Sequence, residues 1–173
     1  MQIRLARQDE YPAVRAFYHA LIDAMQSSNY AIGWKKDVYP APEFLRASIE
    51  EKELYVGLEK ETIIAAMVLN HSCNDGYKEF HWPTMAPAEE VTIIHALGVH
   101  PRYSGRGFAK QMVQFAINTA RKTNQKVIRL DVLKGNVPAE RLYASLGFQY
   151  LHTLSMFYED TGWTDYELYE RRL

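Results

Sequence analysis

One apolar run and the turn behind it constrain the fold of this chain most strongly. Residues 91–99, VTIIHALGV, are almost continuously apolar, with His95 as the main exception. A strand without polar alternation must be covered on both faces, which is typical of a central strand in an α/β domain. A turn containing Gly105 and Gly107 follows, and a helical pattern begins there at once. The sequence therefore predicts a buried strand, a glycine turn and a helix in direct succession.

Apolar periodicity predicts the rest of the secondary structure as a mixture of strands and helices. The predicted strands are 2–6, 53–59, 62–71, 91–99, 126–133, 148–159 and 164–171, and the predicted helices are 8–27, 42–52, 107–124 and 136–146. Aromatic and polar loops are expected at 28–41 and 72–89. No repeat or linker interrupts this order, so we expect a single domain over residues 1–173. Its fold class is α/β, with a mixed sheet of about six or seven strands flanked by about four helices.

Composition excludes several classes of function. The 173 residues carry a formal net charge of −1 with scattered basic residues, which argues against a nucleic-acid partner. A single cysteine, Cys73, allows neither an intrachain disulfide nor a cysteine-based zinc cluster, so no metal is expected. The chain shows no transmembrane run and no signal peptide, so we expect no membrane partner and a cytoplasmic location.

The glycine turn has a chemical interpretation and a purely structural one. Where a strand enters a helix through such a turn, unpaired backbone N–H groups and the helix dipole favour a phosphate. Arg106 and Lys110 would add positive charge beside it. On this motif alone, a simple connection between strand and helix explains the residues equally well. The GxxxxGK[ST] and GxGxxG nucleotide patterns are absent.

A second segment completes a recognisable pattern. In NVPAERLYASLGF, residues 136–148, Asn136 is a helix cap and Tyr143 follows on the helix; alone, this is an ordinary amphipathic helix. Together the two segments resemble the GNAT superfamily of acetyl-CoA-dependent N-acetyltransferases over residues 91–150. The matching residues are Val99, Pro101, the turn Ser104–Ala109 with Gly107 and Ala109 at its small positions, Asn136, Ala139, Tyr143, Gly147 and Phe148. Ser104 departs from the family pattern, in which Arg or Gln is usual.

The resemblance implies a GNAT fold and a site for acetyl-CoA as acetyl donor. The backbone of Leu97 to Val99 is expected to pair with the pantetheine arm, and the N–H groups from Gly105 to Lys110 to hold the pyrophosphate. The cofactor would lie where the strand ending at Val99 diverges from the strand starting at Val127. The residues implied to bind the cofactor are Leu97, Gly98, Val99, Ser104, Gly105, Arg106, Gly107, Phe108, Ala109, Lys110, Asn136 and Tyr143.

The resemblance also implies catalytic roles. The Leu97 N–H would donate to the oxyanion and Tyr143 would protonate the departing thiolate. His95 is a candidate general base, with a structural histidine as the equal alternative. Strand alternation predicts that His95, Leu97 and Val99 share one face.

The acceptor is less constrained by the sequence. We expect an N-acetyltransferase that acts on a primary amine, foremost of a small metabolite, by direct transfer in a ternary complex. Alternatives are a peptide N-terminal or protein lysine acetyltransferase, and a non-catalytic acyl-CoA-binding sensor. Because dimers are common in such folds, a homodimer is a further expectation. The loops that would border the acceptor carry Tyr30, Trp34, Tyr39, Tyr77, Trp82, Trp163 and Tyr166, most of them expected to pack structurally.

Overall fold

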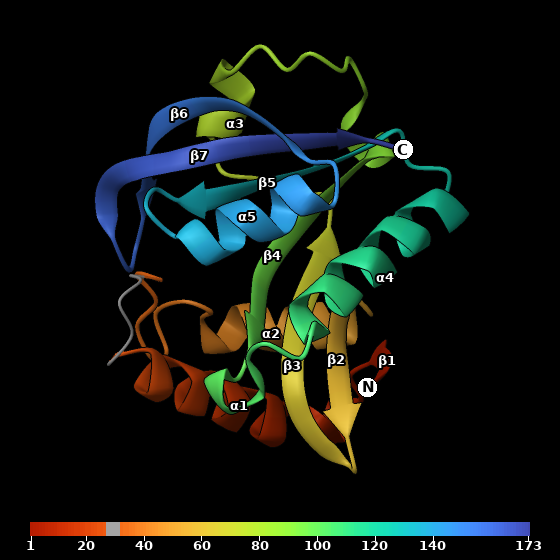
Figure 1. Ribbon diagram of the computed structural model, residues 1–173, viewed down its shortest axis with the longest axis vertical. Helices are drawn as coiled ribbons and strands as arrows, with labels where there is room; N and C mark the ends of the chain where they lie inside the picture. The colour runs from red at the N-terminus through yellow and green to blue at the C-terminus, as the bar shows by residue number, and fades with distance from the viewer. Residues whose placement is uncertain (27–31) are drawn as a thin grey trace.

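The computed structural model describes residues 1–26 and 32–173, and Figure 1 shows the arrangement of the elements. The strands are β1 (Gln2–Leu5), β2 (Leu54–Glu59), β3 (Thr62–Asn70), β4 (Val91–Val99), β5 (Val127–Leu133), β6 (Gln149–Tyr158) and β7 (Gly162–Arg172). The helices are α1 (Tyr11–Met25), α2 (Pro42–Glu50), α3 (Gly76–Glu79), α4 (Phe108–Lys122) and α5 (Val137–Ser145). Among the described residues, no helix has the length and apolar character needed to cross a membrane.

The strands form one seven-stranded sheet in the order β1-β2-β3-β4-β5-β7-β6. Every neighbouring pair is antiparallel except β4 and β5, which run parallel. Their pairing covers only Val91 to Ile93 on β4 and Val127 to Arg129 on β5. Beyond this point β4 and β5 no longer pair with each other, although β4 still pairs with β3 and β5 with β7, so the middle of the sheet opens as a wedge.

Helices cover both faces of the sheet. On one face α1 and α2 pack on β2, β3 and Ala96 of β4. On the other face α4 and α5 pack on β3, β4 and β5 (Figure 1). The apolar residues of α4 that face the sheet recur every three or four positions, namely Phe108, Met112, Val113, Ala116, Ile117 and Ala120. A third cluster joins Tyr77 of α3 to β4, β5, β6 and β7.

The predicted mixed sheet and its seven strands are confirmed, and the ends of the predicted elements differ from the observed ones by at most three residues. The structure divides the segment predicted as helix 8–27 into a 3₁₀ turn, Gln8–Glu10, and α1. The segment 72–89, predicted as a loop, contains the one-turn helix α3. The side chain of Asn74 starts this turn, because its Oδ1 accepts a hydrogen bond from the Gly76 N–H at 2.9 Å.

The predicted alternation along β4 is wrong after His95. Met67 of β3 faces two residues, Ala96 and Leu97, because the register shifts between Ala66 and Val68. Ala96 takes up the extra residue with a positive φ of 49°. His95 and Ala96 therefore turn consecutively toward the α1–α2 face, whereas Leu97 and Val99 pack with the α4 cluster.

A buried ion pair fixes the 72–90 segment over β5 and β7. Arg129 Nε donates to Glu170 Oε2 at 3.1 Å, and Arg129 Nη2 donates to the Thr84 carbonyl at 2.7 Å. The Arg129 guanidinium also lies 4.2 Å from the centre of the Trp82 ring. Trp82 Nε1 in turn donates to the backbone carbonyl of Tyr77. The pair thus holds the segment that carries Tyr77.

We predict that Glu170→Leu lowers the free energy of unfolding by about 3 kcal/mol, because it leaves the Arg129 cation buried without its partner. Adding Arg129→Met to that variant should recover most of the loss, since no buried charge then remains. Urea unfolding of the two single variants and the double variant measures this cycle. Additive losses in the double variant would contradict the interpretation.

Candidate active site

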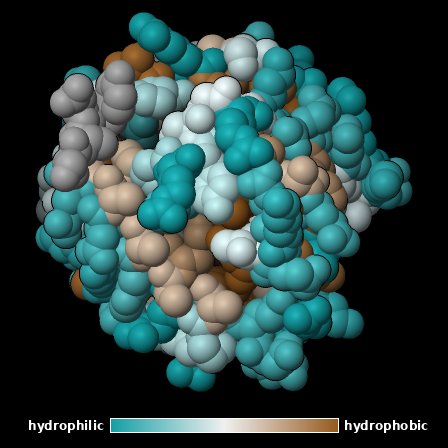
Figure 2. All heavy atoms as spheres, turned by 60° about the horizontal axis from the view of Figure 1, so that its bottom comes forward, coloured by the Kyte–Doolittle hydropathy of each residue, from teal (hydrophilic) through white to brown (hydrophobic). Residues whose placement is uncertain are grey.

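A cavity of about 860 Å³ occupies the wedge between β4 and β5. Its walls come from the C-terminal half of β4, the turn before α4, the end of β5, α5 and the β6–β7 hairpin. Leu21, Met25, Ile32, Trp34 and Tyr39 close it from the N-terminal region. In Figure 2 the α1 end of the molecule comes forward, and apolar surface gathers in a central hollow within a hydrophilic rim. The wedge is therefore a cleft and not a packing gap filled by side chains.

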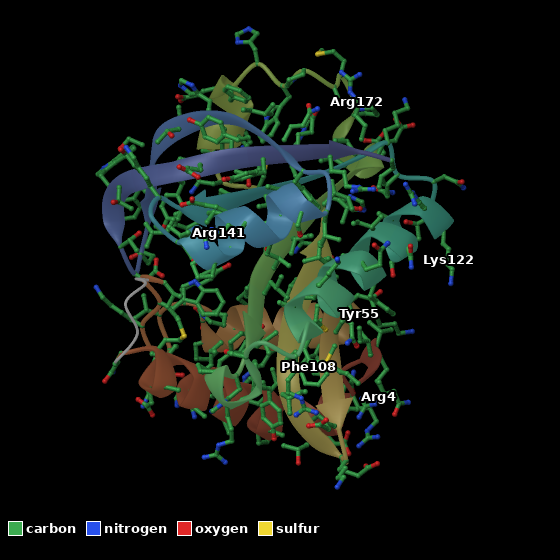
Figure 3. All side chains as sticks on the ribbon, in the orientation of Figure 1. Arg4, Tyr55, Phe108, Lys122, Arg141 and Arg172 are labelled. Atoms are coloured by element: carbon green, nitrogen blue, oxygen red, sulfur yellow. The ribbon has the colours of Figure 1, made fainter. Side chains whose placement is uncertain are left out.

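The glycine turn forms one end of this cleft. Gly105 and Gly107 have φ values of 75° and 73°, a left-handed conformation that glycine adopts without strain. Gly107 caps α4, whose first residue, Phe108, is labelled in Figure 3. Ala109 and Lys110 in the first helical turn also line the cavity. The open N–H groups and dipole of a 15-residue helix thus point at the cleft, a geometry that suits a phosphate.

The Arg106 side chain does not take its predicted place. It is absent from the cavity wall, and its Nη1 and Nη2 donate to the Glu59 carboxylate at 3.0 and 2.5 Å. Its guanidinium also lies 4.7 Å from the centre of the Phe108 ring. The pair with Glu59 ties the turn to the end of β2, whereas Lys110 lines the cavity.

Helix α5 supplies the opposite wall. Asn136 caps it, its Oδ1 accepting from the Ala139 N–H at 3.4 Å, and Asn136 also lines the cavity. Tyr143 is buried against Phe148, with ring centres 5.4 Å apart. Burial raises the pKa of its phenol above the ordinary value of 10, so Tyr143 stays protonated at neutral pH. Tyr143 also lines the cavity.

Residues 94–99 of β4 line the cleft, and both sides of the strand contribute. Leu97, Gly98 and Val99 lie on the cavity wall, as do Ser104 and Gly105 beyond them. Beyond Ile93 no residue of β4 pairs with β5, so this strand edge is available to an extended ligand arm.

His95 is held as a neutral side chain. Its Nε2 lies 3.0 Å from Asn70 Oδ1 and 2.9 Å from the Ser72 carbonyl, both acceptors, so Nε2 carries the proton. Its ring packs edge-on against Phe44 at 6.1 Å. Burial lowers the pKa of His95 to about 4. His95 lines the cavity, but a group with this pKa is a weak proton acceptor near pH 7.

The structure adds Asp131, which sequence reasoning missed. Asp131 of β5 lines the cavity, and its Oδ1 accepts hydrogen bonds from the hydroxyls of Tyr77 at 2.7 Å and Tyr158 at 3.0 Å. Burial raises the pKa of this carboxyl, and the two tyrosine hydroxyls oppose the shift. The available signal was one acid inside the apolar run VIRLDVL.

Four aromatic side chains, Trp34, Tyr39, Tyr158 and Tyr166, form a continuous wall near Asp131, which we call the aromatic wall. The Tyr39 and Tyr158 rings meet at 6.4 Å and join the N-terminal region to the β6–β7 hairpin. Asp160, which is buried, lines the same end of the cavity.

The other predicted acceptor-side aromatics have different places. Tyr77 binds Asp131, and Trp82 packs on Arg129 away from the cleft. Trp163 is 75% exposed on the β6–β7 hairpin. Tyr30 lies outside the described residues. No group of three or more metal-ligating side chains occurs in residues 1–26 and 32–173.

Comparison with known proteins identifies the family. The Acetyltransferase (GNAT) family model matches residues 14–148, well over half of the chain, and the chain therefore belongs to this family. It is 33% identical over 69 residues to the N-alpha-acetyltransferase RimI of Mycobacterium tuberculosis. That match covers 40% of this chain and 42% of the relative, so it spans less than half the length of either protein.

Solved structures confirm the predicted fold. A GNAT-family acetyltransferase from Streptococcus agalactiae superposes with a TM-score of 0.80 at 19% identity, over 99% of this chain and 95% of that chain. The protein yncA from Salmonella typhimurium, solved with its cofactor acetyl-CoA, superposes with a TM-score of 0.71 at 18% identity, over 100% and 94%. At these identities the likeness establishes the fold alone.

We predict that His95 titrates near pH 4 and destabilises the protein in mild acid. In the unfolded chain His95 has a pKa of about 6.5, whereas in the folded protein its pKa is about 4. Between these two pH values the unfolded state therefore binds a proton that the folded state does not. The contribution of His95 to stability is thus complete above pH 6.5 and falls by about 3 kcal/mol as the pH approaches 4.

Ring NMR shifts of His95 and urea unfolding between pH 4 and 7 measure this effect. The control is His95→Gln, which keeps a donor toward Asn70 and should lack this part of the pH dependence. A His95 pKa near 6.5, or equal pH slopes for both proteins, would show that the ring is not held neutral by burial.

Proposed function

We propose that this protein transfers the acetyl group of acetyl-CoA to the primary amine of a small molecule, directly in a ternary complex. One observation carries the proposal: a single cleft through the sheet joins the open N–H groups at the start of α4 to a buried carboxylate. The glycine turn and Tyr143 lie toward one side of the sheet, and Asp131 with the aromatic wall lies toward the other. Two reactants entering from opposite sides would meet between β4 and β5.

The cofactor half of the cleft suits acetyl-CoA. The N–H groups from Gly105 to Lys110 would hold the pyrophosphate, and the unpaired edge from Leu97 to Val99 would bind the pantetheine arm like an added strand. Asn136 would donate to the same arm from the opposite wall, since its Oδ1 is used by the helix cap. When bound, acetyl-CoA supplies the activated acetyl thioester.

The chemistry needs an oxyanion donor, an acid and a base. The amine nitrogen forms a bond to the acetyl carbon, and the Leu97 N–H stabilises the oxyanion that develops. Before this attack the ammonium proton of the acceptor passes to Asp131, whose negative charge attracts a cationic amine, whereas neutral His95 does not. When the C–S bond breaks, the sulfur takes the proton of the Tyr143 hydroxyl. The second proton, which the nitrogen loses as it becomes an amide, returns to Tyr143 through water, and Asp131 releases its proton to solvent.

The shape of the acceptor end favours a small molecule. The contact between Tyr39 and Tyr158 bridges the cleft beside Asp131, and Tyr166 continues the same wall. Tyrosine and tryptophan faces attract an ammonium group and pack against an apolar body. A compact amine with an apolar or aromatic substituent would place its ammonium group near Asp131 and its substituent against the aromatic wall.

The RimI relative favours a second candidate, the N-terminal amine of a peptide. A small amine fits beside the contact between Tyr39 and Tyr158, whereas a peptide must extend past it. Comparing kcat/KM for arylalkylamines with that for short peptides of free N-terminus separates them, and a higher value for the peptides would replace the small-molecule acceptor.

We predict that Tyr143→Phe lowers kcat about 100-fold, because the thiolate loses its proton donor. Titration calorimetry should give an acetyl-CoA Kd within about twofold of the wild type, because the ring is kept. The control is Tyr55→Phe, a tyrosine that packs on Phe115 outside the cleft (Figure 3). An unchanged kcat would remove Tyr143 from the acid role, and no acetyl-CoA binding by the wild type would overturn the proposed function.

We predict that Asp131→Asn lowers kcat/KM for the amine about 100-fold or more and leaves the KM for acetyl-CoA near the wild-type value, since only the acceptor loses its proton acceptor. Steady-state kinetics with each substrate varied in turn measures both constants. Asp165→Asn is the matched control, because that exposed carboxylate pairs with Lys134 away from the cleft. Wild-type kinetics for Asp131→Asn would exclude the carboxylate as base.

A further inference from the structure

The bulge in β4 places a strained residue directly before the proposed oxyanion donor. Ala96 has a φ of 49°, a left-handed conformation that an L residue adopts only at some energetic cost. The register gives Ala96 and Leu97 no separate partners on β3, and β5 has already diverged at this level. The sheet ladder alone therefore does not fix the peptide group that joins them.

A buried tyrosine does fix it. The Tyr18 hydroxyl donates to the Ala96 carbonyl oxygen at 2.8 Å. Tyr18 lies in the middle of α1, 1% exposed, and its ring packs edge-on against Phe17 at 5.2 Å and Trp34 at 6.0 Å. This ring is held on two sides, so the hydroxyl has a defined position. Tyr18 is absent from the cavity wall and thus does not touch a ligand there.

The peptide geometry converts this contact into an effect on the cleft. In a planar trans peptide the C=O and N–H bonds point in opposite directions, and the Ala96 carbonyl and the Leu97 N–H belong to the same peptide group. Since the carbonyl points to Tyr18 on the α1 face, the Leu97 N–H points away from α1. Leu97 itself packs with the α4 cluster and lines the cavity.

We propose that Tyr18 is a positioning residue for acetyl transfer, whose hydroxyl holds the Ala96–Leu97 peptide so that the Leu97 N–H faces the thioester carbonyl. A hydrogen bond to the carbonyl also polarises the amide and makes its N–H a stronger donor. This inference rests on the proposed function. It adds that the oxyanion donor is oriented from the opposite face of the sheet, by a residue that contacts neither reactant.

The test is Tyr18→Phe, which removes the hydroxyl and keeps the ring. We expect kcat to fall about tenfold, less than for direct loss of an oxyanion donor, with both KM values within about twofold. Isotope-edited infrared spectra of acetyl-CoA carrying a ¹³C carbonyl give a readout that packing does not move. The carbonyl stretch should shift to lower frequency on binding to the wild type, and much of that shift should vanish in Tyr18→Phe.

Ile49→Val is the matched control, since it removes packing from the same apolar cluster and leaves the Tyr18 ring and hydroxyl in place. It should lower Tm and leave the carbonyl shift unchanged. Replacing Tyr18 by 4-aminophenylalanine restores a donor at the same site and should rescue both kcat and the shift.

The outcomes separate the two proposals. A wild-type carbonyl shift that persists fully in Tyr18→Phe, or an equal loss of kcat in Ile49→Val, overturns the role of Tyr18 and leaves the proposed function standing. A wild type that transfers no acetyl group overturns the proposed function, and the role of Tyr18 falls with it. Should Tyr18→Phe not fold, the 4-aminophenylalanine variant decides: a loss of the carbonyl shift despite the restored donor overturns the inference.

Discussion

The divergence of β4 from β5 after three paired residues is the constraint on which the rest of the structure depends. A parallel pair that continued its ladder would fill the centre of the sheet with backbone hydrogen bonds. Instead the facing edges of the two strands, which no longer pair with each other, border a cavity that reaches from the glycine turn to Asp131. The helices on the two faces keep this opening from collapsing, because α1 and α4 are each anchored in a separate apolar cluster.

A strained residue, Ala96, and a buried carboxyl, Asp131, both border this opening. Backbone strain and buried ionisable groups are typical of functional sites. The bulge at Ala96 removes one peptide group from the regular ladder, and the Tyr18 hydroxyl on the α1 face donates a hydrogen bond to its carbonyl oxygen. Asp131 stays in an apolar setting because Tyr77 and Tyr158 satisfy one of its oxygens. Tyr77 in turn depends on the buried pair of Arg129 and Glu170, so a segment far from the glycine turn supports the Asp131 end of the cleft.

The sequence predicts the sheet, the glycine turn and α5 well, because their signals are local: apolar periodicity, the glycines between a strand and a helix, and the cap at Asn136. Three features escaped prediction because their causes are tertiary. Nothing local marks Ala96 as a bulge, since alanine also fits regular alternation. One acid in a strand is ordinarily a solvated side chain, so Asp131 gave no signal of its role. The Arg106 guanidinium forms an ion pair with Glu59, 47 residues away in the sequence, and does not line the cleft.

The central claim is that the acetyl thioester lies in the wedge with its carbonyl on the β4 bulge. A crystal structure of the protein with acetyl-CoA tests it most directly. The account predicts the pyrophosphate at the N–H groups from Gly105 to Lys110 and the thioester oxygen within about 3 Å of the Leu97 nitrogen. A cofactor bound outside the β4–β5 wedge, or a carbonyl turned away from Leu97, would contradict it.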